Sequence, residues 1–343
     1  MKIVHIESGL GNQMLSYCEY LALQKANPND KCYIETIVFD IPECNDIICQ
    51  WNGYELKKIF GINAPNIKDV VPPQKWEIII SLVRKSQFWN KKWNYPRYIT
   101  QAFNQVSYNI ENIRGDFEQN QPTKIKEIIN DVRDYFTHST WLGCTLKRFI
   151  PGRSINHESV LFPICNNDVF TGQRLLFSHI NSGIERISGE IKKNFVFPQF
   201  NNKKNLEFSA FLSSINSVFI HARRGDMLGR NGWCYKYGYF RRATSYIKKH
   251  VEKPVFVFFT DPGSIEWCKK NLLLFGLDSK KDKIYFVDWN SGDQSFRDMQ
   301  LMSYCKHGII TNSSFGWWGS YFITNPNKIT ISPLKEINTT HHF

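Results

Sequence analysis

A regular alternation of strand and helix signals over residues 217–332 constrains the fold of this chain more than any other feature. Short apolar runs rich in β-branched and aromatic residues predict strands, and segments with apolar residues at the helical period predict helices between them. The predicted strands cover residues 217–221, 254–260, 283–287, 307–311 and 328–332, and the predicted helices cover residues 239–250, 264–274, 296–305 and 314–323. Strands and helices alternating at this spacing favour a parallel sheet with helices on both faces.

A second α/β signal opens the chain. Residues 2–6 predict a strand, residues 8–13 a glycine-rich turn and residues 14–26 a helix, which together form the first unit of an α/β domain. We therefore predict an α/β protein of two Rossmann-like domains that face a cleft.

The predicted domain boundary falls between the two signals. The N-terminal domain is expected over residues 1–205 and the C-terminal domain over residues 206–343. Residues 65–170 are rich in aromatic side chains, Lys and Asn, and they are expected to add helices, such as 125–136, and loops to the N-terminal domain.

The net charge narrows the choice of partners. Lys and Arg number 43 against 31 Asp and Glu, which gives a formal charge of +12. Such an excess favours a nucleotide phosphate, a nucleic acid or an anionic membrane surface. The basic residues are scattered, however, and no recognisable nucleic-acid-binding motif accompanies them. We therefore expect no nucleic-acid partner, and most of these charges are expected on a solvated surface.

The cysteines and the apolar runs bear on the cellular compartment. Nine cysteines, an odd number with no Cys-x-x-Cys pair, predict buried free thiols in a reducing cytosol. No signal peptide is expected ahead of the first predicted strand, and no apolar run approaches the roughly 20 residues that span a bilayer. A cytoplasmic protein is expected, and its basic surface could hold it peripherally on an anionic membrane.

The segment after the strand at 217–221 contains the strongest candidate site. His221, Arg223, Arg224 and Asp226 follow that strand directly, and ligands of open α/β sheets bind at the carboxyl ends of strands. Two adjacent arginines could neutralise a diphosphate through charge-assisted hydrogen bonds. Adjacent side chains do not point one way, so one arginine is expected on the phosphate and the other on a carboxylate. A surface cluster of Arg and Asp is the alternative.

A second candidate anion site follows the strand at 307–311. In Asn312-Ser313-Ser314-Phe315-Gly316, either serine is a natural N-cap, and a helix start also directs backbone N–H groups at an anion. The Trp317-Trp318 pair behind it is expected in the core. No Asp-x-Asp pair occurs in the chain, so we expect no metal at the diphosphate, and positive side chains would do the work of a cation.

Three blocks together resemble the α-1,2-fucosyltransferase family, glycosyltransferase family 11. The blocks are Gly9-Leu10-Gly11-Asn12-Gln13-Met14, His221-Ala222-Arg223-Arg224-Gly225-Asp226 and Asn312-Ser313-Ser314-Phe315-Gly316-Trp317-Trp318-Gly319. Residues 259–261, 265–267, 287–290 and 298–302 also resemble the family in order and spacing. The likeness is dense over residues 217–333 and present over residues 1–25.

The resemblance implies a fold and a reaction. The fold is GT-B, with an acceptor-side N-terminal domain and a C-terminal domain that binds the sugar nucleotide. The reaction moves L-fucose from GDP-β-L-fucose, with inversion and without a metal or other cofactor, to the 2-hydroxyl of a terminal galactose. The acceptor would be an oligosaccharide or a surface glycan.

The resemblance also assigns roles to residues of this chain. Arg223 would bind the diphosphate and offset the charge on the departing GDP, with Arg224 beside it in the donor site. His221 and Asp298 would hold the guanine or the ribose. The remaining donor-site residues would be Asn312, Ser313, Ser314 and Phe315 in the C-terminal domain and Gly11, Asn12 and Gln13 in the N-terminal domain.

Three points remain open at this level. Asp226 is the favoured general base because it lies beside the phosphate site, but it could instead hold an arginine. Glu7-Ser8-Gly9 stands where the family usually has paired glycines, which leaves the acceptor open. The alternatives are a fucosyltransferase of another linkage, such as α-1,6, and a non-catalytic carbohydrate- or nucleotide-binding protein.

Overall fold

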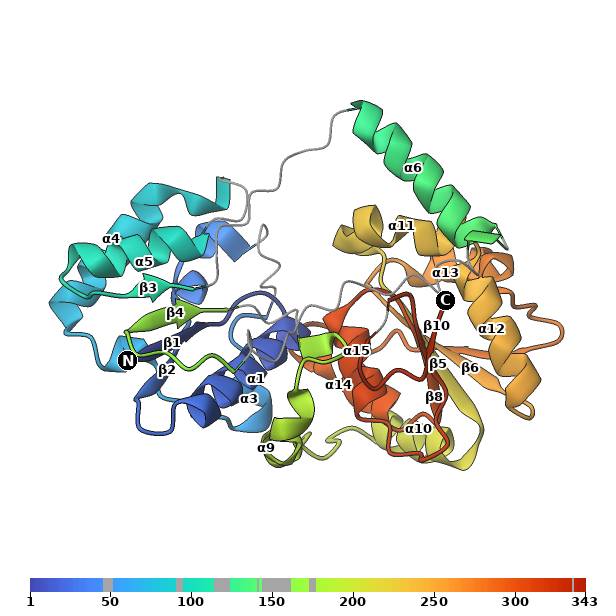
Figure 1. Cartoon of the computed structure of the whole chain (residues 1–343). Coiled ribbons are helices and arrows are strands. Elements are labelled where there is room, and N and C mark those ends of the chain that lie inside the picture. Colours follow the sequence, from blue (N-terminus) through green and yellow to red (C-terminus); the bar gives the residue numbers. More distant parts are fainter. Residues whose placement is uncertain are drawn as a thin grey trace. The chain divides into compact units, whose positions relative to one another are not determined.

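The computed structural model describes the chain except for residues 46–51, 91–94, 114–123, 141, 144–161, 173–176 and 335. Contacts divide it into two compact units (Figure 1). The first comprises Met1–Gln121 with Asn156–Pro198, and the second comprises Pro122–Ile155 with Gln199–Phe343. Each unit contains its own parallel sheet, and each is described by itself.

The first unit is built on a four-stranded sheet in the order β2-β1-β4-β3. Every neighbouring pair is parallel. Its strands are β1 (Lys2–His5), β2 (Cys32–Glu35), β3 (Glu111–Asn112) and β4 (Val169–Thr171). Its helices are α1 (Leu10–Ala26), α3 (Leu56–Phe60), α4 (Pro73–Ser86), α5 (Tyr95–Gln105) and α9 (Ser188–Asn194).

The opening turn of the first unit is shorter than the sequence predicts. Helix α1 begins at Leu10, four residues before the predicted start, so most of the predicted glycine-rich turn is its first helical turn. The chain reverses at Ser8, whose φ is +64°, and Gly9 is the extended N-cap. A glycine usually marks the residue with a positive φ, but here Ser8 has the positive φ and Gly9 does not. The position of Gly9 therefore did not indicate where the helix begins.

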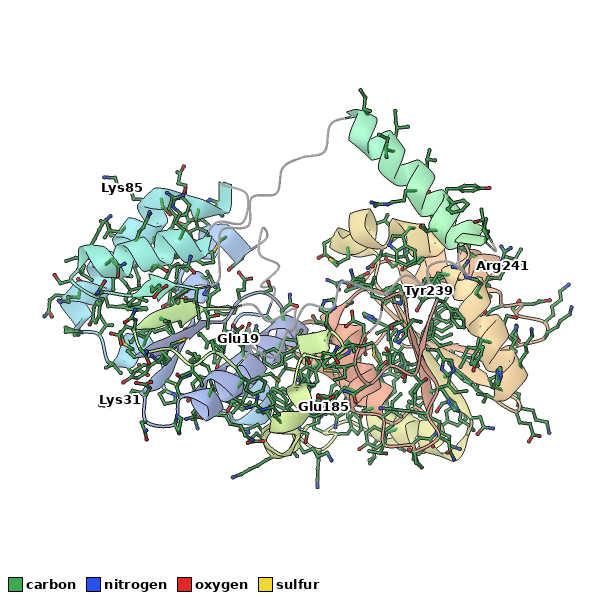
Figure 2. All side chains as sticks on the ribbon, in the orientation of Figure 1. Glu19, Lys31, Lys85, Glu185, Tyr239 and Arg241 are labelled. Carbon is green, nitrogen blue, oxygen red and sulfur yellow. The ribbon has the colours of Figure 1, made fainter. Side chains whose placement is uncertain are left out.

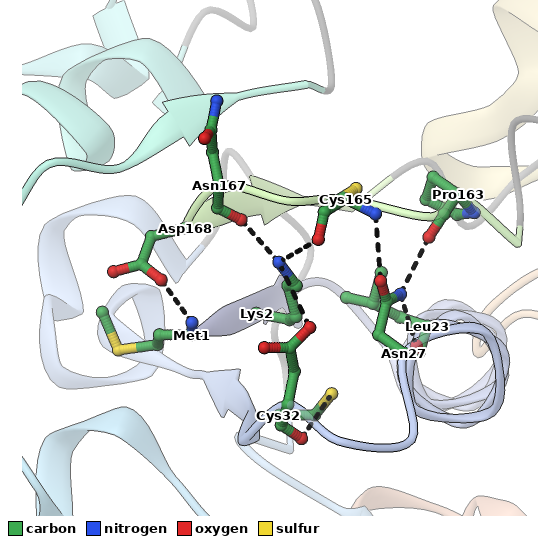
Figure 3. Close-up of polar contacts among 10 residues, drawn as sticks. Met1, Lys2, Leu23, Asn27, Cys32, Pro163, Cys165, Asn167 and Asp168 are labelled. Carbon is green, nitrogen blue, oxygen red and sulfur yellow. Dashed lines mark hydrogen bonds and ion pairs between the residues drawn. The ribbon is translucent and has the colours of Figure 1, made fainter.

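Lys2 attaches the segment before β4 to the start of β1 (Figure 3). Its ammonium is almost fully buried and donates to the carbonyl oxygens of Cys165 at 2.6 Å and Asn167 at 2.5 Å. The Asp30 carboxylate lies 3.5 Å away and balances the charge. Parallel strands need long connections, and these bonds fix where the connection from β3 returns to the sheet.

The second unit is built on a six-stranded sheet in the order β10-β9-β8-β5-β6-β7. All of its neighbouring strands are parallel. The strands are β5 (Ser217–Ala222), β6 (Val255–Thr260), β7 (Lys283–Phe286), β8 (His307–Ile310), β9 (Thr330–Ser332) and β10 (His341–His342). The first five are the predicted strands within two residues at each end, and β10 was not predicted.

Helices of the second unit cover both faces of this sheet. They include α10 (Lys203–Ser214), α11 (Leu228–Lys236), α12 (Tyr239–His250), α13 (Ile265–Lys270), α14 (Phe296–Ser303) and α15 (Ser314–Tyr321). The same unit also contains α6 (Lys124–Ser139). The predicted helix at 264–274 is divided into α13 and a 3-10 turn over Leu272–Phe275. Two Rossmann-like α/β units are the components of the GT-B fold, so the predicted fold class is confirmed in its components. Their placement about a cleft stays a prediction.

Strand β5 separates two different cores. Val218 and Ile220 point into an aromatic core with Tyr239 and Phe240 of α12. Tyr239 is fully buried (Figure 2), and its hydroxyl donates to the carbonyl oxygens of Ile310 and Ile331, which ties α12 to β8 and β9. The alternate residues of β5, Phe219 and His221, therefore face the opposite side of the sheet.

Residues 65–170 run from beyond β2 into β4, and their described part contains helices as well as strand β3. Helices α4, α5 and α6 all lie within the predicted stretch of 65–170. By its contacts α6 belongs to the second unit, where Tyr135 packs edge-on against Tyr237 with ring centroids 5.9 Å apart. None of the described helices has the length and apolarity to cross a membrane. The seven described cysteines are all free, and six of them are buried, whereas Cys49 and Cys144 lie outside the described residues.

Candidate functional site

The site lies at the carboxyl edge of the six-stranded sheet. Because β8, β5 and β6 are neighbours in the sheet, the residues that follow them meet at one edge. These are Asn312 after β8, Arg223 after β5 and Asp261 after β6. The structure thus brings the two predicted anion-binding blocks together, and it adds a carboxylate that the sequence placed only near a strand end.

The guanidinium of Arg223 is held between two carboxylates. Its Nη2 lies 2.8 Å from Oδ1 of Asp226, and its Nη1 contacts Oδ1 of Asp261. The Arg223 side chain keeps 20% of its surface exposed, whereas Asp261 keeps only 8%. A guanidinium has five donors in a rigid fork, so two carboxylates that contact different nitrogens fix its plane.

The backbone of Arg223 is fixed as well as its side chain. Its N–H donates to Oγ1 of Thr311 at 3.3 Å, and its carbonyl accepts from Tyr235 Oη at 3.1 Å and from Asn231 Nδ2 at 3.3 Å. Asn231, which is fully buried on α11, also accepts from the backbone N–H of Asn312 at 3.2 Å. One amide therefore bridges the ends of β5 and β8. No pattern in the sequence indicated Asn231, because a helix over residues 228–236 was not predicted.

Arg224 has a different environment from Arg223. Its guanidinium carbon lies 3.3 Å from the ring centroid of Trp267 on α13 and 5.1 Å from that of Tyr235. Its backbone N–H donates to Oδ2 of Asp261 at 2.5 Å. One arginine was expected on phosphate and the other on a carboxylate. Instead Arg223 has both carboxylates, and Arg224 stacks on aromatic rings as a cation–π partner.

His221 is the last residue of β5 on the sheet face opposite the aromatic core. It is 4% exposed, and its ring lies 5.7 Å from that of Phe315 at an angle of 31°. Burial first, and the charge of Arg223 second, lower the pKa of His221 to about 3, so its imidazole is neutral at ordinary pH. His221 is thus a neutral hydrogen-bonding group beside a permanently charged one.

The block that follows β8 starts α15 as predicted. Ser313 is the N-cap in extended conformation, but its side chain makes no capping hydrogen bond. Asn312, Ser314 and Phe315 are all partly exposed. Trp317 and Trp318 are buried and pack edge-on against each other, which confirms that this pair belongs to the core.

Asp298 belongs to a separate polar cluster at the end of β7. Its Oδ1 accepts from Asn290 Nδ2 at 2.8 Å, and Asn290 in turn contacts Asn205 of α10, which also accepts from Trp289 Nε1 at 2.7 Å. Burial raises the pKa of the Asp298 carboxyl to about 7, although the Asn290 hydrogen bond works against this rise. At neutral pH the carboxyl is therefore part neutral and able to donate as well as accept.

Gly11, Asn12 and Gln13 lie in the first turn of α1, in the first unit. The buried Gln13 amide donates to the carbonyl oxygens of Ser8 and Gly53, both at 2.8 Å, and accepts from the N–H of Glu55 at 2.8 Å. These bonds give Gln13 a structural role within its own unit. The contribution of these three residues to the donor site stays a prediction.

A metal centre was not expected at this edge. Among the residues that the structure describes, no group of three or more His, Cys, Asp or Glu side chains could hold a metal ion. Asp226 and Asp261 both form ion pairs with the Arg223 guanidinium.

Residues 191–341 match the family model of Glycosyl transferase family 11. The match contains Arg223, Asp261 and Asn312 and almost the whole of the six-stranded sheet. The family that the sequence resembles is thus also the family whose model matches, and the resemblance is confirmed over this part of the chain.

Individual relatives point to the same class of enzyme. An alpha-1,2-colitosyltransferase of Escherichia coli is 36% identical over 144 residues, which are 39% of this chain and 47% of that protein. A galactoside alpha-(1,2)-fucosyltransferase 1 of Saimiri sciureus is 30% identical over 30% of this chain and 28% of its own length. The O-antigen biosynthesis glycosyltransferase WbnK of Escherichia coli is 23% identical over 96% of this chain and 93% of its own. The match to the colitosyltransferase thus spans about half of that relative.

Among solved structures, NodZ alpha-1,6-fucosyltransferase soaked with GDP-fucose aligns over 96% of this chain and 94% of its own. The identity is 13% and the TM-score is 0.42.

Proposed function

We propose that this protein is an inverting fucosyltransferase that moves L-fucose from GDP-β-L-fucose to the 2-hydroxyl of a terminal galactose in an oligosaccharide or surface glycan. The single observation that supports this most is the Arg223 guanidinium, fixed by Asp226 and Asp261 at the carboxyl edge of a family 11 domain. The α-1,2 linkage is supported by relatives that transfer fucose or colitose with that linkage.

The proposed chemistry is a single in-line displacement. The acceptor hydroxyl attacks C1 of fucose from the face opposite GDP, while the bond from C1 to the β-phosphate oxygen breaks and GDP departs. Negative charge grows on the β-phosphate as that bond breaks. A guanidinium that is already fixed in place stabilises this charge more in the transition state than in the ground state. In this proposal Arg223 does so without a metal, and His221, Arg224, Asp298 and the residues from Asn312 to Phe315 hold the rest of the donor.

Two roles remain for Asp226 within this proposal. As a general base it would take the proton of the acceptor hydroxyl. Its 2.8 Å contact with Arg223 supports the second role, in which it holds the guanidinium in place. Asp261, which is more deeply buried, shares the holding role from the other side and also binds the N–H of Arg224.

The experiment combines a donor panel with product analysis. The protein is mixed with GDP-fucose, GDP-mannose or UDP-galactose and a set of galactose-terminated oligosaccharides, and released nucleotide is measured. We expect acceptor-dependent GDP release with GDP-fucose and an α-1,2 linkage in the product by NMR. An α-1,6 product would correct the linkage. If GDP binds but no donor is consumed with any acceptor, the protein is a nucleotide-binding protein and the proposal is wrong.

The partners follow from the same proposal. They are GDP-fucose and a galactose-terminated glycan, with no cofactor. The +12 net charge supports a peripheral association with an anionic membrane surface, where lipid-linked acceptors would be found. Sedimentation with vesicles that contain anionic lipid, compared with neutral vesicles, tests this association.

A further inference from the structure

One nitrogen of the His221 ring is enclosed by the start of α15. Its Nδ1 is buried and has no hydrogen-bond partner among the described residues. The neighbour that encloses it is Gly316, in the first turn of α15. A Cβ atom placed on Gly316 would come within 2.4 Å of His221 Nδ1 and 2.9 Å of Cγ. Real Cβ contacts are never that short, so the ring occupies this position only because residue 316 has no side chain.

The same strand face shows the arrangement a second time. A Cβ on Gly308 of β8 would meet the Phe219 ring at 2.4 Å. Phe219 and His221 are the alternate residues of β5, so each ring on this face is accommodated by a glycine of a neighbouring element. For Phe219 this is ordinary packing. For His221 it also decides which ring nitrogen is left for a ligand.

The enclosure fixes where the proton of the neutral ring resides. A proton on Nδ1 would bury an N–H donor with no acceptor, and orphaned buried N–H groups are rarer and costlier than under-satisfied acceptors. The proton therefore belongs on Nε2, and a neutral imidazole then donates only from that atom. The tautomer of a histidine is commonly set by what its other nitrogen meets. In His221 the apolar contact of Nδ1 with Gly316 sets the tautomer.

We propose that Gly316 is a positioning residue of the donor site, which sets the ring position and the Nε2–H tautomer of His221 so that His221 donates a hydrogen bond to a diphosphate oxygen of the bound nucleotide. This inference rests on the proposed function and deepens it, and it places His221 on the diphosphate, where the resemblance implies the guanine or the ribose. A diphosphate oxygen is the favoured acceptor because Arg223 lies two residues further along the chain and α15 begins beside the ring. The group is a neutral donor whose strength does not change over ordinary pH.

The first test reads the tautomer of the wild-type protein without any nucleotide. Long-range 1H–15N correlation spectra of histidine-labelled protein distinguish the two neutral tautomers from imidazolium, and the His221 signals are assigned by their loss in His221→Gln. We expect the Nε2–H form at pH 7. An Nδ1–H form or an imidazolium at pH 7 overturns the inference, whether or not the protein transfers fucose.

The second test uses two amide substitutes for His221. The amide nitrogen of Gln can reach the place of Nε2, whereas that of Asn reaches only the place of Nδ1. We expect His221→Gln to bind GDP within about fivefold of the wild type and His221→Asn to lose about 10–100-fold, the value of a hydrogen bond to a charged group. Equal losses in the two variants contradict the inference. A loss in His221→Asn that disappears with 2′,3′-dideoxy-GDP as the probe would place the bond on the ribose and overturn the diphosphate assignment.

The third test places a methyl group against the ring. Gly316→Ala is compared with Gly319→Ala, which lies in the same helix but meets the flexible side chain of Met302 instead. We expect Gly316→Ala to change the His221 15N signals and to weaken GDP binding at least tenfold, and Gly319→Ala to do neither. Equal GDP affinity in the two alanine variants overturns the role of Gly316. If Gly316→Ala does not fold, the wild-type spectrum and the Gln and Asn pair still decide.

These readouts separate the inference from the proposed function. If the wild type does not bind GDP, the proposed function fails while the tautomer measurement still stands. If GDP binds and fucose is transferred but the tautomer is wrong, only the inference about Gly316 and His221 fails.

Discussion

At the scale of single residues, Arg223 and Arg224 look equivalent in the sequence and differ completely in the structure. Arg223 has its guanidinium between two carboxylates, and Arg224 stacks on Trp267. The difference arises because the Arg223 side chain lies at the edge of the sheet beside Asp226 and Asp261, whereas the Arg224 side chain lies against Trp267 of α13. A substitution at each position therefore tests a different property, namely the proposed catalytic role of Arg223 and the aromatic stacking that holds Arg224 in the proposed donor site.

Arg223→Ala should lower the rate of transfer by about 10²–10³-fold, the usual effect of losing a fixed donor to a developing oxyanion. Arg223→Lys should restore little, because an ammonium cannot contact Asp226, Asp261 and a phosphate with the geometry of a planar fork. Arg241→Ala, on the exposed surface of α12 (Figure 2), is the control and should keep the wild-type rate. Retention of most activity in Arg223→Ala would remove Arg223 from the reaction.

Asp226→Asn separates the two roles of this carboxylate. We expect kcat to fall at least tenfold in either role, since an amide neither accepts a proton nor balances a guanidinium. Titration with GDP then distinguishes them. An unchanged Kd supports the general base, whereas a Kd raised together with the loss of kcat supports the holding of Arg223. Wild-type kcat in this variant would show that Asp226 does neither.

At the scale of elements, α15 is the helix that completes the site, and its far end is stabilised by a half-buried lysine. Lys328 donates to the carbonyl oxygens of Ser320 at 2.9 Å, Ile323 at 3.1 Å and Tyr321 at 3.4 Å, where the helix leaves its last carbonyls unpaired. Burial lowers the pKa of Lys328. A cation at this end also complements the helix dipole, whose positive end is the candidate anion site.

Lys328→Met should therefore lower the free energy of unfolding by about 1–3 kcal/mol, because three carbonyl groups lose a charged donor while the apolar stem is kept. Denaturant titration measures this, with Lys253→Met as the control, since Lys253 is 91% exposed. A loss below about 0.5 kcal/mol would mean that water replaces the ammonium at no cost. The rate of transfer by the folded variant should stay close to that of the wild type, because Lys328 is at the opposite end of α15 from the site.

Asp298 on α14 gives the fold a pH dependence of known sign. Its pKa is about 7 in the folded protein and about 4 in the unfolded chain, so between these values only the unfolded chain loses the proton. Its contribution to stability therefore falls as the pH rises from about 4 to 7 and is constant above. The amide in Asp298→Asn does not titrate, so this variant does not lose stability as the pH rises. The free energy of unfolding of the variant minus that of the wild type should therefore increase by about 1–4 kcal/mol over that range. Denaturant titration at pH 5 and pH 8 measures this change, with the exposed Asp293→Asn as the control. The same difference in free energy of unfolding at both pH values would contradict the raised pKa of Asp298.

How much of these elements the sequence predicts depends on their periodicity. The strands β5 to β8 are continuous apolar runs, so they were predicted within a residue or two. Helix α11 was missed because its segment, with Gly229 and Gly232 and no apolar period, has no amphipathic stripe. The two-residue β10 was missed because its pairing with β9 is imposed by tertiary structure. Short or irregular elements lack the repeats that a pattern needs.

The candidate site was predicted in part for the same reason. Residues that directly follow strands, such as Arg223 and Asn312, could be placed at the sheet edge because strand ends set their position. Asn231 and Trp267 come from helices, and only packing brings them to that edge. In the first unit, the fully buried His5 lies 2.6 Å from Glu35 and 3.3 Å from Glu7, a cluster that no spacing suggested. Burial opposes the charge of His5, but the two carboxylates raise its pKa overall.

At the scale of the whole molecule, the two parallel sheets divide the chain into a unit with the family 11 match and a unit with little of it. The second unit contains most of the predicted donor site. The first contains Gly11, Asn12 and Gln13 and would supply the acceptor side. This division explains why the residues described here bear on the proposed donor chemistry, whereas the acceptor is proposed from the resemblance and from what the relatives are named for.

The central claim is that the Arg223 guanidinium, held by Asp226 and Asp261, and not a metal, assists the departure of GDP from GDP-fucose. The most direct measurement is acceptor-dependent release of GDP from GDP-fucose by the whole protein with excess EDTA present. We predict the same rate with EDTA as with added Mg²⁺ or Mn²⁺, and at least a 10²-fold lower rate in Arg223→Ala under both conditions. A rate that disappears with EDTA and returns with a divalent cation, or one that Arg223→Ala leaves unchanged, would contradict the account.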